Sequence, residues 1–200
     1  MDRSECVELG FITRVDNLAS ILEFGILSYN VAVTVDHQSV ANEEVQGLRA
    51  AVVIPPGLNL HDYANLYINA RNPMMYFLRN HHTELVVLRV DASVLELPDV
   101  VLSDMNAARN MVRFGPPDEM LPRLDRNRIF ARYWNHDDPM ESYRHKGEMC
   151  AEVLVPGSVP PDYITGIYVS CKSTEHSVSQ VCDTVPIVID AYRFFQGEPG

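Results

Sequence analysis

Residues 60–76, LHDYANLYINARNPMMY, combine many hydrogen-bonding side chains with what looks like the end of a strand. The polar residues all precede Pro73 and are His61, Asp62, Tyr63, Asn65, Tyr67, Asn69, Arg71 and Asn72. A guanidinium and several amides in this position are suited to binding an anionic or polar ligand. His61 and Asp62 could instead simply close a turn.

A single carboxylate stands in the apolar segment MCAEVLV, residues 149–155. If side chains alternate as in a strand, Glu152 shares a face with Cys150 and Leu154. An ionised carboxylate there is costly unless it is paired or lies in a cleft. Two interpretations remain: an ion pair on an edge strand, or a rigid site where Glu152 stabilises positive charge or accepts a proton.

The elements that must position these residues are short and mixed. The pattern TRVDNLASILEFGILS, residues 13–28, predicts a helix that Thr13 caps and Gly25 ends, with a stripe of Leu18, Ile21 and Leu22. Further helices are expected at 39–49, 125–134 and 173–182, and strands at 84–90, 100–103, 149–155, 166–170 and 186–190. Strands without regularly alternating helices predict an α+β fold, here as one domain over residues 1–200.

The charge is acidic overall but uneven. Sixteen basic and 27 acidic residues give a net charge of −11, which argues against non-specific coating of nucleic acid. Residues 105–146 nevertheless hold eight basic and six acidic residues. Fourteen of the 16 basic residues are Arg, whose planar group binds phosphate through two donors. This segment could therefore meet phosphates, although codon bias in a GC-rich genome would also enrich Arg.

The cysteines and histidines do not form a recognisable metal site. Cys6, Cys150, Cys171 and Cys182 lack CxxC spacing, and no histidine pair has the spacing of ligands on one helix. We expect reduced thiols and no bound metal. No apolar run approaches the roughly 18 to 20 residues of a membrane span, and the N-terminus has no signal-peptide pattern. A soluble, cytoplasmic protein is expected.

Five segments, in order, resemble the DarT family of DNA ADP-ribosyltransferase toxins. They are FITRVDNLASILEFGILS (11–28), EEVQGLR (43–49), LHDYANLYINARNPMMY (60–76), LSDMNAA (102–108) and MCAEVLVPGSVP (149–160). The resemblance implies an ADP-ribosyltransferase-like fold with central split β-sheets and peripheral helices. It also implies NAD as the substrate that supplies ADP-ribose, and no metal.

ADP-ribosyl transfer breaks the N-glycosidic bond of NAD through an oxocarbenium-like ribose, as glycoside cleavage does. The site needs a cation for the pyrophosphate, an aromatic ring for nicotinamide and a carboxylate near the developing positive charge. The resemblance assigns Arg71 and Glu152 as the essential pair, 81 residues apart in sequence. Tyr63 or Tyr67 supplies the ring, so residues 60–76 become a wall of the NAD pocket.

Other residues are assigned less directly by the resemblance. The further candidates for NAD binding are Thr13, Asn17, Arg49 and Asn106. Helix capping is the alternative role for Asn17 and Asn106, and a solvated surface position is the alternative for Arg49. For a nucleic-acid strand, the candidates are Arg109, Arg126 and Arg128 in the more basic segment. These three could equally form a solvated helix face.

Two positions depart from the family pattern. Phe11 stands where the family often has a His that contacts NAD, and Cys150 stands where it often has Gln. A thiol cannot read a base edge as an amide can, so the acceptor is left open. The leading hypothesis is a toxin, restrained by an antitoxin, that modifies a nucleobase in single-stranded DNA or in RNA. The alternatives are a protein-modifying transferase, an NAD glycohydrolase and a non-catalytic binding module.

Overall fold

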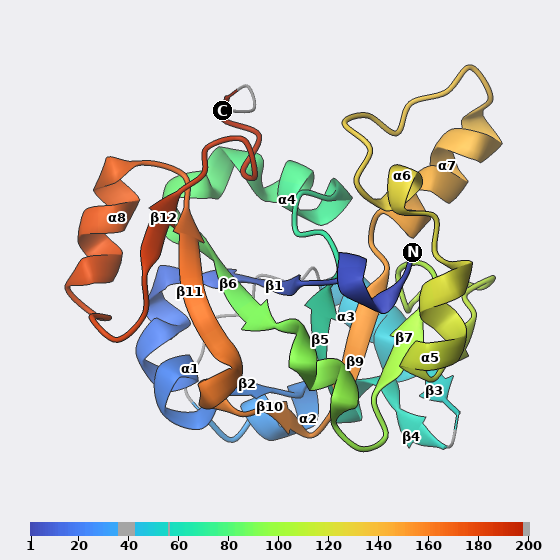
Figure 1. Cartoon of the computed structure of the whole chain (residues 1–200), viewed down its shortest axis with the longest axis horizontal. Coiled ribbons are helices and arrows are strands. Elements are labelled where there is room, and N and C mark those ends of the chain that lie inside the picture. Colours follow the sequence, from blue (N-terminus) through green and yellow to red (C-terminus); the bar gives the residue numbers. More distant parts are fainter. Residues whose placement is uncertain (36–42, 56, 198–200) are drawn as a thin grey trace.

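The computed structural model describes residues 1–35, 43–55 and 57–197. It has the predicted α+β fold, in which a central sheet is surrounded by short helices (Figure 1). The sheet has eight strands in the order β12, β11, β6, β1, β5, β9, β7, β8. In that order the strands are Ile187–Ile189, Ile164–Val169, Leu85–Asp91, Glu8–Arg14, Tyr63–Tyr67, Glu152–Pro156, Val101–Ser103 and Phe114–Gly115. All neighbours are antiparallel except β11 and β12.

The sheet is split between β1 and β5, as the resemblance predicts. These strands share one register pair, Gly10 with Tyr67, whereas β1 pairs with β6 along its whole length. A Cβ atom on Gly10 would lie 2.7 Å from the Cβ of Ala70. Glycine therefore lets β1 approach the segment that follows β5, and the two halves of the sheet diverge on either side of this point.

Two small hairpins and a set of short helices complete the fold. The strands β2 (Ile26–Leu27) and β10 (Ser158–Val159) pair with each other, as do β3 (Val53–Ile54) and β4 (Leu58–Asn59). The α-helices, α1 to α8, are Leu18–Phe24, Tyr29–Ala32, Glu43–Ala50, Pro73–Leu78, Pro117–Met120, Arg126–Ile129, Pro139–Glu148 and Lys172–Ser179. The 3-10 helices are Arg3–Glu5, Val15–Asn17, Leu60–Asp62, Arg79–Glu84, Ala92–Glu96, Leu121–Arg123 and Pro161–Tyr163. Over the described ranges, none of the helices has the length and apolar character needed to cross a bilayer.

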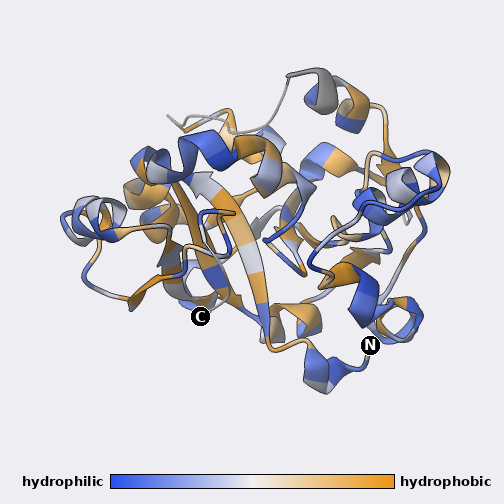
Figure 2. Cartoon of the chain, turned by 90° about the horizontal axis from the view of Figure 1, so that it is seen from above, coloured by the Kyte–Doolittle hydropathy of each residue, from blue (hydrophilic) through white to orange (hydrophobic). Residues whose placement is uncertain are grey.

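The main core lies along the sheet because its central strands are almost wholly apolar. The first four residues of β6, Leu85 to Leu88, are all buried, as are residues 152–155 of β9. Figure 2 shows the hydrophobic colour concentrated on these inner strands and the polar colour on the outer helices. A polar side chain on an inner strand must therefore find its partner inside the protein.

The opening helix is shorter than the predicted one. Thr13 is buried in β1 and does not cap a helix, because β1 pairs with β6 as far as Arg14. The helix itself is α1, and Leu18, Ile21 and Leu22 face the main core as predicted. Gly25 ends α1 with a φ of 85°.

Three further predictions need adjustment. The strand predicted at 149–155 begins only at Glu152, because α7 ends at Glu148 and a turn places the Cys150 amide on the Gly147 carbonyl. The helix predicted at 125–134 is α6, of four residues. Residues 39–42 of the predicted polar helix lie outside the described residues, and the remainder forms α3.

Gly25 gives a direct test of this backbone geometry. Its φ is positive, and an added Cβ would lie 2.2 Å from the Val159 carbonyl oxygen. We expect Gly25→Ala to lower the free energy of unfolding by about 3 kcal/mol or more, because backbone strain and a backbone clash add. The matched control is Gly157→Ala, which has a φ of 72° but open space at the Cβ position. It should lose only about 1–2 kcal/mol in urea unfolding, and equal losses would contradict the clash.

Candidate active site

Glu152 is completely buried, and both of its carboxylate oxygens are hydrogen-bonded. Oε1 accepts from Arg49 Nη1 at 3.2 Å and from the Ala107 amide at 3.0 Å, and Oε2 accepts from Arg49 Nη2 at 3.0 Å. This is a two-point, charge-assisted pair of the kind that a guanidinium forms best. The partner residue, Arg49, is itself only 7% exposed.

Three elements bring these groups together. Glu152 is the first residue of β9, Arg49 lies in the last turn of α3, and Ala107 follows β7. The backbone of Glu152 is fixed as well, since its amide donates to Ser103 Oγ at 3.1 Å. Because β9 lies between β5 and β7, Glu152 is not on an edge strand. The ion pair that we considered is present, but in the interior of the sheet.

The charges of the pair support each other. Burial by itself lowers the pKa of Arg49, but the adjacent Glu152 carboxylate outweighs burial and the pKa is raised. Arg49 therefore stays cationic and keeps a positive charge beside the carboxylate. Burial, followed by the charge of Glu152, raises the pKa of Tyr67 well above its ordinary value. Tyr67 is thus a neutral phenol directly opposite Glu152 in the sheet.

Arg71, the other residue of the predicted essential pair, is hydrogen-bonded elsewhere than at Glu152, and its role toward NAD stays a prediction. The Arg71 guanidinium lies between two aromatic rings, 4.1 Å from the centroids of both Tyr192 and Phe195. Its Nε donates to the Tyr192 carbonyl at 3.2 Å and its Nη1 to the Arg132 carbonyl at 3.1 Å. Arg71 thus fastens the C-terminal segment, whereas the carboxylate partner is Arg49.

The two tyrosines of β5 have different surroundings. Tyr67 lies beside Glu152 and donates its hydroxyl to Met74 Sδ at 2.9 Å. Tyr63 is packed in a separate apolar cluster with Ile54 and Leu60. The structure therefore places Tyr67, but not Tyr63, at the carboxylate.

The remaining candidates for NAD binding fall into two groups. Asn106 accepts from the Ala108 amide at 3.0 Å, which shapes the turn that presents the Ala107 amide to Glu152. Thr13 and Asn17 are buried and hydrogen-bonded to each other, with Asn17 Nδ2 donating to Thr13 Oγ1 at 3.0 Å. Their roles toward NAD stay predictions.

Cys150, at the position of the family Gln, is a buried neutral thiol. Burial is the main cause that raises its pKa to about 12, and the nearby Glu152 carboxylate adds to the effect. Cys150 packs in the apolar cluster that also contains Tyr67 and Met75. It therefore contributes an apolar surface near Glu152 and no charge.

The arginines predicted to bind a strand are largely engaged within the protein. Arg128 forms ion pairs with Glu141 at 2.7 Å and with Glu148, and so attaches α6 to α7. Arg126 lies 3.6 Å from Glu5, and the Arg109 guanidinium lies 3.7 Å from the ring centroid of Tyr143. Much of the basic charge in this segment is thus compensated.

Sequence reasoning missed two groups at the site. Ser103 lies in the segment LSDMNAA that supports the resemblance, so its hydroxyl was a detectable candidate. The Ala107 donor is a backbone amide, so its role cannot be predicted from the pattern of side chains in the sequence. In the part of the chain that the structure describes, no three His, Cys, Asp or Glu side chains are grouped as metal ligands.

Comparison with known proteins identifies the family. A family model described as "ssDNA thymidine ADP-ribosyltransferase, DarT" matches residues 11–196. The chain belongs to the DarT family. Its fold is accordingly that of the DarT structures, as the resemblance in the sequence predicted.

Individual DarT proteins show the extent of the similarity. A DNA ADP-ribosyl transferase from Thermus aquaticus is 30% identical over 88% of this chain and 80% of its own length. A transferase–glycohydrolase fusion protein from Thermosipho africanus is 30% identical over 94% of this chain, which spans 49% of that protein. Among solved structures, Thermus sp. 2.9 DarT with ADP-ribosylated ssDNA superposes with a TM-score of 0.80 at 26% identity, covering 94% of this chain and 96% of that one. Thermus sp. 2.9 DarT has also been solved with NAD+ and with carba-NAD+.

The buried pair predicts a specific pattern of stability. Arg49→Ala leaves the Glu152 carboxylate buried without its cation, so we expect the free energy of unfolding to fall by about 3–5 kcal/mol. The double variant Arg49→Ala/Glu152→Gln should recover part of that loss, because the buried charge is gone. Urea denaturation of both variants measures the difference.

The control is Arg126→Ala, which removes a half-exposed arginine 3.6 Å from Glu5. It should change stability by no more than about 1 kcal/mol. A double variant less stable than Arg49→Ala would contradict an uncompensated carboxylate as the source of the loss.

Proposed function

We propose that this chain transfers ADP-ribose from NAD to a thymidine base in single-stranded DNA. The observation that carries the proposal is the Arg49–Glu152 pair, in which a carboxylate at the start of β9 is held by two hydrogen bonds from a guanidinium. Membership of the DarT family supports both the reaction and the acceptor. The relatives solved with NAD+ and with ADP-ribosylated ssDNA support the two substrates.

In the proposed reaction, the bond between the ribose C1′ and the nicotinamide nitrogen breaks, and nicotinamide leaves with the bonding electron pair. Positive charge then develops on the ribose, where the Glu152 carboxylate stabilises it. A ring nitrogen of the base forms the new bond to C1′, and the proton that it carried is released to water. Because both oxygens of the Glu152 carboxylate already accept hydrogen bonds from Arg49 and Ala107, electrostatic stabilisation is the main role that we assign to it.

Tyr67 and Arg49 complete the proposed NAD site. Tyr67 places a neutral ring directly opposite Glu152, where it can contact the nicotinamide. Arg49 has a positive charge that can act on the pyrophosphate as well as on Glu152. Arg71 stays a predicted NAD-binding residue on the basis of the family resemblance of residues 60–76.

We also propose that the protein acts as a toxin in a toxin–antitoxin or phage-defence system. The Thermosipho africanus relative supports this, since its name joins a DNA ADP-ribosyl transferase to a DNA ADP-ribosyl glycohydrolase. A glycohydrolase acting on the same product would serve as the antitoxin. RNA remains the second nucleic-acid acceptor to be tested.

Transfer of labelled ADP-ribose from NAD to oligonucleotides tests the function. The parent should label a thymidine-containing DNA oligonucleotide but not the same sequence with every thymidine replaced. Glu152→Gln should lower the rate by about 10³-fold or more, because transition-state stabilisation is lost. Glu96→Gln, on an exposed carboxylate beside Arg3, is the matched control and should retain the parental rate. Labelling of RNA or of added protein in preference to DNA would contradict the proposal that DNA is the acceptor.

The roles of the two arginines can be separated by calorimetry. If Arg71 binds the NAD pyrophosphate, Arg71→Ala should weaken NAD binding about tenfold or more. If it only fastens Tyr192 and Phe195, thermal stability should fall while NAD affinity is unchanged. Arg49→Lys retains the charge but loses the two-point geometry, so we expect it to lower the transfer rate even where NAD still binds.

A further inference from the structure

An exposed surface of aromatic rings and arginines lies beside the candidate site. We call it the aromatic surface, and define it as Tyr76, Arg79, Arg132, Tyr133, Trp134 and Phe195. We propose that it binds the nucleotides of single-stranded DNA that flank the modified base. The inference rests on the proposed function and names where the strand lies.

Three distant segments of the chain build this surface. Tyr76 on α4 meets Trp134, with ring centroids 5.4 Å apart, and Phe195, with centroids 5.2 Å apart. Trp134 and Phe195 also meet, at 6.0 Å. All three contacts are edge to face. The rings therefore form one connected cluster whose position is set by packing and not by a flexible loop.

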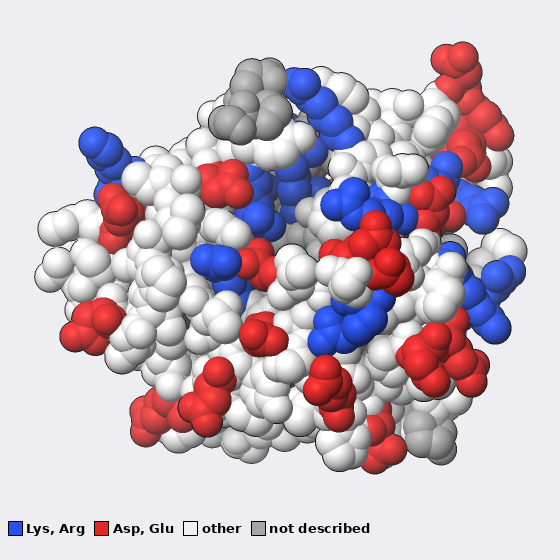
Figure 3. Space-filling view, in the orientation of Figure 1, with Lys and Arg blue, Asp and Glu red and all other residues white. Residues whose placement is uncertain are grey.

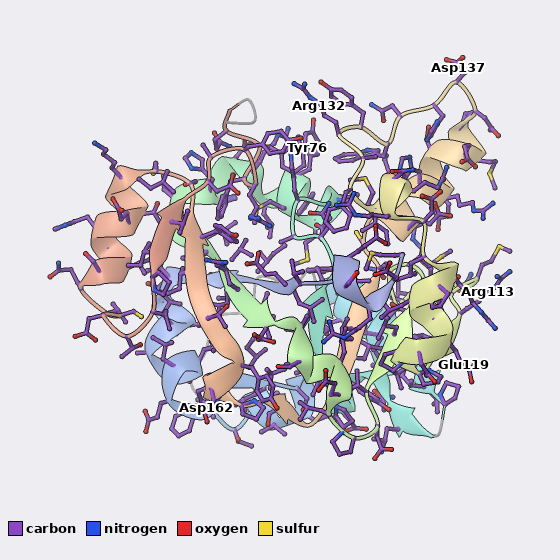
Figure 4. The ribbon with its side chains drawn as sticks, in the orientation of Figure 1. Tyr76, Arg113, Glu119, Arg132, Asp137 and Asp162 are labelled. Carbon is purple, nitrogen blue, oxygen red and sulfur yellow. The ribbon has the colours of Figure 1, made fainter. Side chains whose placement is uncertain are left out.

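Parts of this cluster are open to solvent. Tyr76 is 42% exposed, and the adjoining Tyr133 is 66% exposed. Figure 4 shows Tyr76 and Arg132 near each other at the upper edge of the molecule, with Asp137 farther along the same loop. Exposed tyrosine rings offer faces on which bases stack, and each stacked base contributes about 1–3 kcal/mol.

The charge of the surface matches a phosphate backbone. The Arg79 guanidinium lies 3.9 Å from the ring centroid of Tyr76, and Arg132 lies 5.3 Å from that of Tyr133. Within the described residues, Arg71 and Arg79 donate only to carbonyl oxygens and have no carboxylate partner. The carboxylate whose charge acts on Arg71 is that of Asp190, which is paired with Arg193. In the described part of the chain, the positive charges of Arg71 and Arg79 are therefore not paired with a carboxylate, in contrast to those of Arg126 and Arg128.

The space-filling view agrees with this distribution. Figure 3 shows blue side chains gathered around a hollow in the upper middle of the face, with some red ones at its rim and at the upper right corner, whereas the lower part carries mostly red ones. On a chain with a net charge of −11, a polyanion can approach only where the local charge is positive. The upper part of this face meets that condition.

The helix α4 connects the surface with the site. At its N-terminal end, Met74 accepts the hydroxyl of Tyr67, the residue opposite Glu152. Near its C-terminal end, Tyr76 and Arg79 belong to the aromatic surface. From Met74 to Arg79 the helical rise is about 7.5 Å, or roughly two nucleotides of a strand. A base at Glu152 thus places its neighbours on the aromatic surface.

Binding of fluorescent DNA, measured by anisotropy, tests the surface apart from catalysis. Tyr133→Ala should weaken binding of a 12-nucleotide oligo(dT) about tenfold, and Tyr133→Trp should retain the parental affinity because stacking is kept. Arg79→Gln should weaken binding and reduce the dependence of log affinity on log salt by about 0.7. Phe24→Ala, which removes an exposed ring from α1, is the matched control and should bind as the parent does.

The outcomes distinguish this surface from the proposed function. If Tyr133→Ala and Arg79→Gln bind with the same affinity and salt dependence as the parent, the aromatic surface is not the binding site. If only Tyr143→Ala loses affinity, the strand lies instead at Arg109, whose guanidinium contacts the Tyr143 ring. A parent that binds oligo(dT) through Tyr133 but transfers no ADP-ribose would support the surface and contradict the function. A parent that binds no oligonucleotide would overturn both. Thermal unfolding of each variant confirms that affinity is compared between folded proteins.

Discussion

The two-point ion pair between Arg49 and Glu152 is the interaction on which the candidate site depends. A carboxylate with no exposed surface is stable only when its charge and its lone pairs are satisfied. Here the guanidinium comes from α3 and the third hydrogen bond from the turn after β7. The sheet, one helix and one turn must therefore all be in place before the carboxylate is fully hydrogen-bonded and correctly oriented.

The split in the sheet explains where this carboxylate lies. Glu152 and Tyr67 are register partners on β9 and β5, and Tyr67 is also the single point at which β5 meets β1. The absence of a side chain on Gly10 permits that close approach. After Tyr67 the chain leaves β5 and enters α4 at Pro73, so the residues around Arg71 come directly after the site in the sequence. The same geometry positions the carboxylate and the surface beside it.

Electrostatics divides the arginines into two classes. Arg49 and Arg128 lie against carboxylates and stabilise the fold, the first at β9 and the second between α6 and α7. Arg71 and Arg79 lie on aromatic rings and donate to carbonyl oxygens, which satisfies their donors without cancelling their charge. An acidic protein can in this way retain local positive potential next to an NAD-dependent site.

The sequence by itself predicted the α+β class and the DarT family, and it singled out the carboxylate of Glu152. Each depends on local information: apolar strand patterns, ordered family segments, and one charged residue in an apolar run. The cost of a carboxylate in that segment left two interpretations, an ion pair with a cation or a rigid site in a cleft. The sequence could not indicate which of the fourteen arginines that cation is, because the choice of Arg49 over Arg71 depends on where α3 and the segment after β5 come to lie.

Only the tertiary structure decided the remaining roles. Thr13 became a strand residue because β6 offers backbone partners as far as Arg14, which outweighed the local capping signal. Arg128 became a link between helices because Glu141 and Glu148 approach it from α7. The aromatic surface draws on residues near positions 76, 133 and 195, which no short motif unites. Pairing between distant residues is set by packing of the whole chain, and therefore local sequence patterns do not report it.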